Sequence, residues 1–258
     1  MHSDKGPEAA MKRMVVIRRI IRASIILTLV AVLSTTYLND ERFAELEFPK
    51  PLDIASQDTE RPVSEFPNID WQKWKEINSD IVGWITVNGT KIDYPILQAK
   101  SHAPDYYLSH DICRNRNNEG SIFLDAECEA EGLLSKNSVI FGHHLVNGKG
   151  FSAFAEYGNE GHAMANRNIL LQTPEWKRKL EVIFIEITKG TSRTKVTSFE
   201  DDQQFLLWLN ERLDASKVKL VNEFTLETFP ERIWTFCTCS YTSFDDERTL
   251  VYAREIKS

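Results

Sequence analysis

Short apolar runs separated by Gly, Pro, Asn and other polar residues dominate the chain after residue 80. Runs of this length, bounded by turn residues, are typical of β-strands. Asn88-Gly89 between the first two runs predicts a tight hairpin. The expected strands are Ile81–Val87, Lys91–Leu97, Gly120–Leu124, Ser138–Phe141, Asn168–Gln172, Leu180–Thr188, Arg232–Thr238 and Thr249–Ile256. Many short strands with few helices predict a mostly-β fold, a closed or nearly closed barrel.

Helical periodicity is confined to two places in this part of the chain. Asp70 is a suitable N-cap for a short helix in which Trp71, Trp74 and Ile77 share one face. The segment Phe199–Leu213 has apolar residues at helical spacing and predicts the one long helix of the body. We expect the short helix to pack against the domain.

The N-terminal region has the pattern of a membrane anchor. Residues 23–38 carry no charge, and these sixteen residues fall a little short of the ~20 that span a bilayer core. Six basic residues lie within the first 22 positions, which predicts a cytoplasmic N-terminus and an exported body. A cleaved signal peptide is the rival interpretation, but Ser34–Tyr37 offers a poor exit site. A buried core helix suits the six cations badly.

These patterns divide the chain into four parts. Residues 1–22 form a basic cytoplasmic tail, and residues 23–38 form a single-pass anchor in the cell membrane. Residues 39–68, which are rich in proline and charge, form a stalk or linker. Residues 69–258 form one folded domain on the extracellular side. The formal net charge is −7 although the tail is basic, so the body is acidic and nucleic acid is excluded as a partner.

Two cysteines near the C-terminus are the strongest candidates for chemistry. Cys237 and Cys239 lie two apart in a predicted strand, so they face the same side. Cys239 ends that strand before a polar loop, a position that suits a thiol nucleophile. Arg248 directly precedes the next expected strand and would return to Cys239 if the two strands pair antiparallel. A cation at that position could stabilise an oxyanion.

A histidine pair supplies the candidate general acid and base. His143 follows Gly142 at the end of a predicted strand, where its imidazole is accessible. His144 is the competing candidate. The remaining histidines stand in polar segments or the tail and are assigned surface or packing roles: His2, His102, His110 and His162.

Two alternatives stay open at this point. His143, His144, Cys237 and Cys239 have the ligand types of a zinc site, although their spacing matches no common zinc motif. The chain could instead be an anchored surface binding module in which these residues are incidental. The favoured interpretation needs no metal and no cofactor.

The motifs together resemble the sortase family, specifically class B. Members carry a Thr-Leu-x-Thr-Cys signature, which residues 235–239 match as Thr-Phe-Cys-Thr-Cys. Arg248 follows at a similar spacing, and His143 follows a glycine near a strand end, as in the family. Three further stretches are similar to class B sequences: residues 80–85 (Asp-Ile-Val-Gly-Trp-Ile), 92–96 (Ile-Asp-Tyr-Pro-Ile) and 120–125 (Gly-Ser-Ile-Phe-Leu-Asp).

The resemblance implies a sortase-type eight-stranded β-barrel with N-terminal helices and one long helix before the penultimate strand. It also implies a cysteine transpeptidase at the surface of a Gram-positive cell. Such an enzyme cuts the C-terminal sorting signal of a surface protein after Thr and joins the Thr carbonyl to an amine. The amine comes from a cell-wall peptidoglycan precursor or from a pilin lysine. In this interpretation Cys239 is the nucleophile, His143 the general acid/base and Arg248 the oxyanion stabiliser.

The signature departs from the family pattern at two positions. Phe236 replaces the usual Leu, which is a conservative apolar change. Cys237 stands where class B members commonly have Ser, so a second thiol lies near the nucleophile. We hypothesise that Cys237 has no catalytic duty but is open to oxidation with Cys239.

Overall fold

The computed structural model describes residues 65–190, 195–240 and 246–256. The predicted tail, the predicted anchor and most of the predicted stalk lie outside these residues. Among the described helices, none combines the length and the apolar character that crossing a membrane requires.

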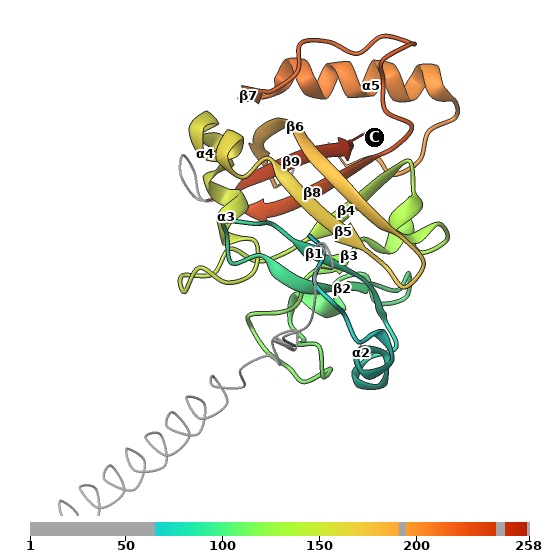
Figure 1. The fold of residues 1–258 in the computed structure, drawn as a ribbon, viewed down its shortest axis with the longest axis vertical. Coiled ribbons are helices and arrows are strands. Elements are labelled where there is room, and N and C mark those ends of the chain that lie inside the picture. Colours follow the sequence, from blue (N-terminus) through green and yellow to red (C-terminus); the bar gives the residue numbers. More distant parts are fainter. Residues whose placement is uncertain (1–64, 191–194, 241–245, 257–258) are drawn as a thin grey trace, which may run out of the picture. The chain divides into compact units, whose positions relative to one another are not determined.

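The described strands form one continuous sheet that closes on itself (Figure 1). They are β1 Ile81–Thr86, β2 Asp93–Gln98, β3 Phe123–Leu124, β4 Asn137–Phe141, β5 Asn168–Gln172, β6 Lys177–Lys189, β7 Val218–Lys219, β8 Ile233–Cys239 and β9 Glu247–Glu255. Their order is β5-β1-β2-β3-β4-β8-β9-β6-β7, and pairing of β5 with β6 closes the ring. The short strand β7 is an addition to β6. The expected eight-stranded barrel is therefore confirmed.

Alternation along the strands separates the barrel interior from its outer face. On β8, Trp234 and Phe236 belong to the interior cluster, whereas Ile233 and Cys237 belong to a second cluster outside it. On β9, Val251 lies in the interior cluster and the residues on either side of it lie outside. Successive side chains of a strand point to opposite faces, so every second residue of each strand faces the core.

The predicted helix after Asp70 is confirmed as α2, Trp71–Ile77. The Asp70 carboxylate accepts a hydrogen bond from the Lys73 N–H at 3.1 Å, which caps the first turn. Trp74 is buried, and its ring centroid lies 5.1 Å from that of Trp84. This contact fixes α2 against the outer face of β1.

The long helix is α5, Asp202–Ala215, which starts three residues later than predicted. Asp201 accepts a hydrogen bond from the Gln204 N–H at 2.8 Å, and this cap sets the start. The ring of Phe199 instead packs on Phe205 from outside the helix, with centroids 4.9 Å apart. In Figure 1, α5 and α2 lie on opposite sides of the barrel. The apolar residues of α5 join Cys237 in the outer cluster.

The expected strand Gly120–Leu124 is shorter than predicted, because only β3, Phe123–Leu124, is a strand. Gly120 has φ +59°, which is incompatible with an extended strand. The sequence also missed several short helices: α3 Ser152–Ala155, α4 Glu160–Ala165, and 3₁₀ turns at Tyr106–Leu108, Ala126–Cys128, Gly132–Leu134 and Glu156–Gly158. They connect strands and are too short to leave a periodic pattern.

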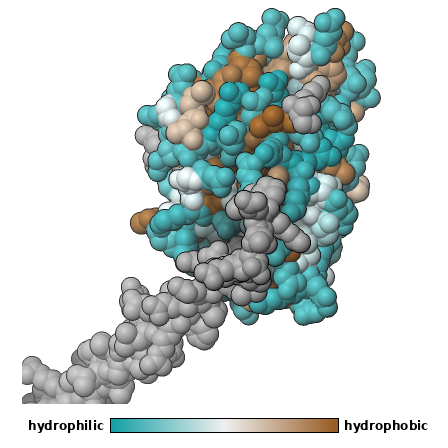
Figure 2. Space-filling model, in the orientation of Figure 1, coloured by the Kyte–Doolittle hydropathy of each residue, from teal (hydrophilic) through white to brown (hydrophobic). Residues whose placement is uncertain are grey.

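The face shown in Figure 2 is mostly hydrophilic, with hydrophobic residues in scattered places. The most exposed large apolar side chains are Val146, Leu207 and Leu226, which lie in separate segments. Such single exposures are normal and mark no binding face.

Candidate active site

Cys239 and Arg248 are direct cross-strand neighbours in the hairpin of β8 and β9. The two strands pair antiparallel, as expected, and the register sets Cys239 opposite Arg248. Both residues are at positions whose side chains point to the outer face of the sheet, as does that of Cys237. Residues directly opposite on one face have Cβ atoms about 4.5–5.5 Å apart. The hairpin therefore sets the backbones of Cys239 and Arg248 directly opposite each other, with both side chains on one face.

The hydrogen bonds at the end of the hairpin show whether Cys239 and Arg248 form a hydrogen-bonded or a non-hydrogen-bonded pair. The Ser240 N–H donates to the Glu247 carbonyl at 3.2 Å, so these two residues form the hydrogen-bonded pair. The next pair, Cys239 with Arg248, is then of the non-hydrogen-bonded kind, in which side chains lie closer. The Ser240 hydroxyl also donates to the buried Glu247 carboxylate. This second contact secures the hairpin beside the thiol.

His143 follows the last residue of β4, the neighbour of β8 on its other edge, by two positions. The two strands are parallel, with Phe141 beside Cys237, and the Gly142 N–H donates to the Cys237 carbonyl at 3.1 Å. β4 and β8 therefore end on the same side of the barrel, where β9 begins. His143, Cys239 and Arg248 thus lie at the same end of three adjacent strands.

The imidazole of His143 is held by a loop carbonyl. Its Nε2 lies 2.8 Å from the carbonyl oxygen of Leu108. A carbonyl oxygen can only accept, so Nε2 carries the proton and Nδ1 is the nitrogen left for exchange. The loop supplies the orienting group that a catalytic histidine needs.

Arg248 is tethered at its own end of the site. Its guanidinium donates to the Glu247 carbonyl at 3.1 Å and lies 3.4 Å from the Asp246 carboxylate. A Cβ added to Gly190 would meet the guanidinium carbon at 3.0 Å, so the glycine leaves room for it. These contacts hold a partly exposed cation beside Cys239.

Cys237 is the second thiol on this face. It is 8% exposed and packs in the outer cluster beneath α5. Burial raises the pKa of the Cys237 thiol to about 12, against an opposing effect of the Arg248 guanidinium. Only a thiolate attacks a carbonyl, so at neutral pH this thiol is not a competing nucleophile.

We expect Cys237→Ser to retain most of the peptide cleavage activity while lowering the melting temperature. The hydroxyl is similar in size to the thiol but is placed in an apolar cluster, where a polar group costs about 1–3 kcal/mol without a partner. Steady-state kinetics and thermal unfolding of the same preparation test this expectation. A loss of turnover as severe as that of Cys239→Ala would show that Cys237 has a catalytic duty.

The structure also places the remaining cysteines and His144. The four cysteines are free thiols, with Cys113 exposed and Cys128 buried. His144 forms an isolated bridge with Gly150. Among the described residues, no group of three or more His, Cys, Asp or Glu side chains is arranged to hold a metal. The donors of the alternative zinc site therefore do not form such a cluster.

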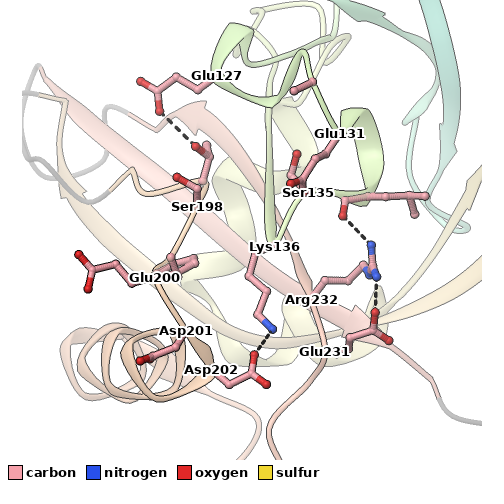
Figure 3. Close-up of a pocket in the computed structure, with 14 residues that line it drawn as sticks. Glu127, Glu131, Ser135, Lys136, Ser198, Glu200, Asp201, Asp202, Glu231 and Arg232 are labelled. Carbon is pink, nitrogen blue, oxygen red and sulfur yellow. Dashed lines mark hydrogen bonds and ion pairs between the residues drawn. The ribbon is translucent and has the colours of Figure 1, made fainter.

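A pocket of about 530 Å³ lies elsewhere on the domain, where the segments before β4, β8 and α5 meet (Figure 3). Lys136 lies 2.6 Å from Asp202, and Arg232 pairs with Glu231. The other carboxylates that line the pocket are Glu127, Glu131, Glu200 and Asp201. Lys136 and Arg232 precede β4 and β8, whereas the candidate site follows these strands. None of the described residues that line the pocket is Cys or His, so it offers no thiol chemistry.

The sequence does not point to the groups that orient the candidate residues. The Leu108 carbonyl is a backbone atom, and no side-chain pattern marks it. Gly120 falls within an expected strand, although a glycine inside a strand pattern is itself a sign of close backbone approach. Gly190 lies beside Arg248 because β6 and β9 pair, whereas Asp246 is two residues before Arg248 in the chain.

Comparison with known proteins shows what the chain is similar to. No family model matches it. It is 29% identical over 252 residues to sortase B of Staphylococcus aureus (strain NCTC 8325 / PS 47), covering 96% of this chain and 98% of the relative. Two solved structures, a Staphylococcus aureus sortase B–substrate complex and a sortase B complexed with triglycine, are each 30% identical with a TM-score of 0.62. Each comparison covers 72% of this chain, with 84% of the first relative and 85% of the second.

Proposed function

The chain belongs to the class B sortases, a group of cysteine transpeptidases, and we propose that it cleaves the C-terminal sorting signal of surface proteins after Thr and transfers the acyl group to an amine. The observation that carries this proposal is the cross-strand pair of Cys239 and Arg248 with the strand of His143 alongside. A binding module would not need that arrangement, and the relatives favour neither it nor a zinc protein.

In the first half-reaction the Cys239 thiolate attacks the carbonyl carbon of the substrate Thr. Negative charge develops on the carbonyl oxygen, and Arg248 donates hydrogen bonds to it. The His143 imidazolium gives its proton to the leaving amine as the peptide bond breaks. The acyl group then rests on sulfur as a thioester, and His143 is neutral.

In the second half-reaction an amine attacks the thioester. His143 takes a proton from the attacking nitrogen, Arg248 again stabilises the oxyanion, and the thiolate leaves as the new amide forms. Water is far more concentrated than the acceptor, so transfer depends on how the site positions the amine. Hydrolysis of the thioester is the expected side reaction when no acceptor is present.

Arg248 suits the oxyanion role because its guanidinium is tethered before substrate arrives. Donors that are already oriented need no reorganisation as charge develops, and one such donor is typically worth on the order of 10²–10³ in rate. Its contacts with the Glu247 carbonyl and Asp246 support this preorganisation.

The acceptor is proposed from the chemistry of the relatives. A sortase B has been solved with triglycine, and a glycine amine of a cell-wall precursor is the corresponding proposal for this chain. A pilin lysine is the second candidate acceptor, because both are primary amines. No metal or cofactor takes part in either half-reaction.

The location follows from the part of the chain before the described domain. We infer a cytoplasmic tail over residues 1–22, a membrane anchor over 23–38, a stalk over 39–68 and an extracellular catalytic domain over 69–258. The six basic residues before the uncharged run support this orientation. It brings the thiol to the side of the membrane where surface proteins and cell-wall amines are found.

Mass spectrometry of reaction products tests the proposal. The full-length chain is incubated with peptides that contain candidate sorting signals, with triglycine or an Nα-blocked lysine as the acceptor. We expect cleavage after Thr, a peptide–acceptor conjugate, and an acyl-enzyme mass on the chain, all unchanged by a metal chelator. A folded chain that cleaves no peptide of the panel would favour a binding module, and activity lost to chelator would favour the zinc alternative.

A further inference from the structure

The loop of residues 105–121 precedes β3 and contacts the ring of His143. This loop is the wall of the site on the His143 side. Its Leu108 carbonyl accepts the Nε2–H at 2.8 Å. The C-terminal end of the same loop comes back beside Tyr107, where the Ser121 N–H donates to the Tyr107 carbonyl at 2.9 Å. Gly120 lies between the two carbonyls and the imidazole.

Gly120 has no room for a side chain. A Cβ at this position would lie 2.7 Å from the Tyr107 carbonyl oxygen, 2.8 Å from the Leu108 carbonyl oxygen and 2.9 Å from Cδ2 of His143. All three distances are below those that real Cβ atoms show, and two of the three neighbours are backbone atoms. A side chain must therefore displace at least one of these neighbours, the two carbonyls or the imidazole, and with it the contact between the Leu108 carbonyl and His143.

The wall is anchored far from the thiol. Tyr107 is buried, and its hydroxyl donates to the Asp80 carboxylate at 2.7 Å and accepts from the Asn78 amide at 3.1 Å. Arg114 from the same loop reaches Asp80 at 3.2 Å. Burial, followed by the hydrogen bond to Asp80, raises the pKa of Tyr107 to about 12, so the hydroxyl remains a donor. The Leu108 carbonyl is thus fixed by its neighbour in the chain.

We propose that Gly120 is a positioning residue for His143: its missing side chain lets the Leu108 carbonyl hold Nε2–H, which leaves Nδ1 as the atom that exchanges protons. In the neutral ring Nδ1 carries the lone pair that accepts a proton from the incoming amine. In the imidazolium Nδ1–H is the acid that protonates the leaving amine. This inference rests on the proposed function, because the proton transfer matters only if His143 is the general acid and base. The contact between the His143 ring and the Leu108 carbonyl can nevertheless be measured without turnover.

The chain contains a matched control for Gly120→Ala. Gly132 has φ +60°, almost the same backbone conformation, and nothing lies within 4 Å of a Cβ built there. Gly132→Ala therefore carries the same strain of a left-handed residue without the crowding. The two variants differ in what the new methyl group meets.

The experiment records ¹⁵N spectra of histidine-labelled full-length chain in both variants, with His143→Gln used to assign the His143 signals. We expect the unaltered chain and Gly132→Ala to show a protonated Nε2 and an unprotonated Nδ1 in the neutral ring. Gly120→Ala should show mixed or reversed tautomers, and its kcat should fall by about 10²-fold with a smaller change in KM.

Equal spectra and equal kcat for the two glycine variants would overturn the inference. If His143→Gln were fully active, the proposed proton carrier would be wrong, yet the spectra would still decide whether Gly120 sets the tautomer. Should Gly120→Ala fail to fold, Tyr107→Phe replaces it, because this change removes one anchor of the wall and keeps the buried ring. It should then show partial loss of the Nε2–H signal, and an unchanged signal would count against the proposal.

Discussion

Cys239→Ala is expected to abolish both cleavage and transfer, with a loss in kcat/KM on the order of 10⁶, as found when an enzyme loses its covalent nucleophile. The neighbouring thiol of Cys237 cannot replace it. Cys237 is almost completely buried, and burial raises its pKa to about 12. Without sulfur at position 239 no thioester forms, so the acyl-enzyme mass should disappear together with the conjugate.

The matched control for this variant is Cys113→Ala, because Cys113 is the exposed free thiol of the described residues. A methanethiosulfonate reagent should label both Cys113 and Cys239 in the unaltered chain. Activity should survive the removal of Cys113 and remain sensitive to the reagent. If Cys239→Ala still formed a covalent acyl-enzyme, or if Cys113→Ala were the inactive variant, the nucleophile would be elsewhere.

The pairing of β8 with β9 could be predicted from the sequence because it is local. A strand, a short polar loop and a second strand leave few alternatives to an antiparallel hairpin, and the register then follows from the loop length. Cys239 and Arg248 come together on that argument, and the structure has them as direct partners.

The position of β4 beside β8 could not be derived in the same way. These strands are parallel and about 90 residues apart, and parallel pairing has no short connection that sets its register. That Gly142 bonds to the Cys237 carbonyl is a consequence of barrel closure, which depends on the whole set of strands. His143 is therefore a candidate from its residue type and its place after a strand, and its neighbours were not predictable.

The role of the loop from Asp105 to Ser121 could not be predicted from the sequence. No strand or helix is expected in it before Gly120, yet it carries the carbonyl that orients the imidazole. Backbone carbonyls are present at every residue, so only the fold can select one of them. The helix α5 is the opposite case, since its apolar period predicted it well and only its cap at Asp201 moved the start.

His143→Gln is expected to lower kcat by about 10²–10⁴-fold with a smaller effect on KM, the range typical for loss of a general acid and base. Glutamine has an amide N–H that can still donate to the Leu108 carbonyl, so the wall keeps its partner while proton exchange is lost. Without an acid the amine must leave unprotonated, and the first half-reaction slows most. Single-turnover measurements of acyl-enzyme formation and of its aminolysis separate the two steps.

The neighbouring histidine provides the control, and a small molecule provides the rescue. His144→Gln changes the same residue type one position along the chain and should retain most of the activity. His143→Gly should recover part of its lost activity in added imidazole, because the free ring can occupy the vacated space and carry the proton. If His144→Gln were the more damaging change, and His143→Gly gained nothing from imidazole, the general acid and base would be His144. The Leu108 carbonyl would then be holding a structural histidine, since the contact would persist without a catalytic consequence.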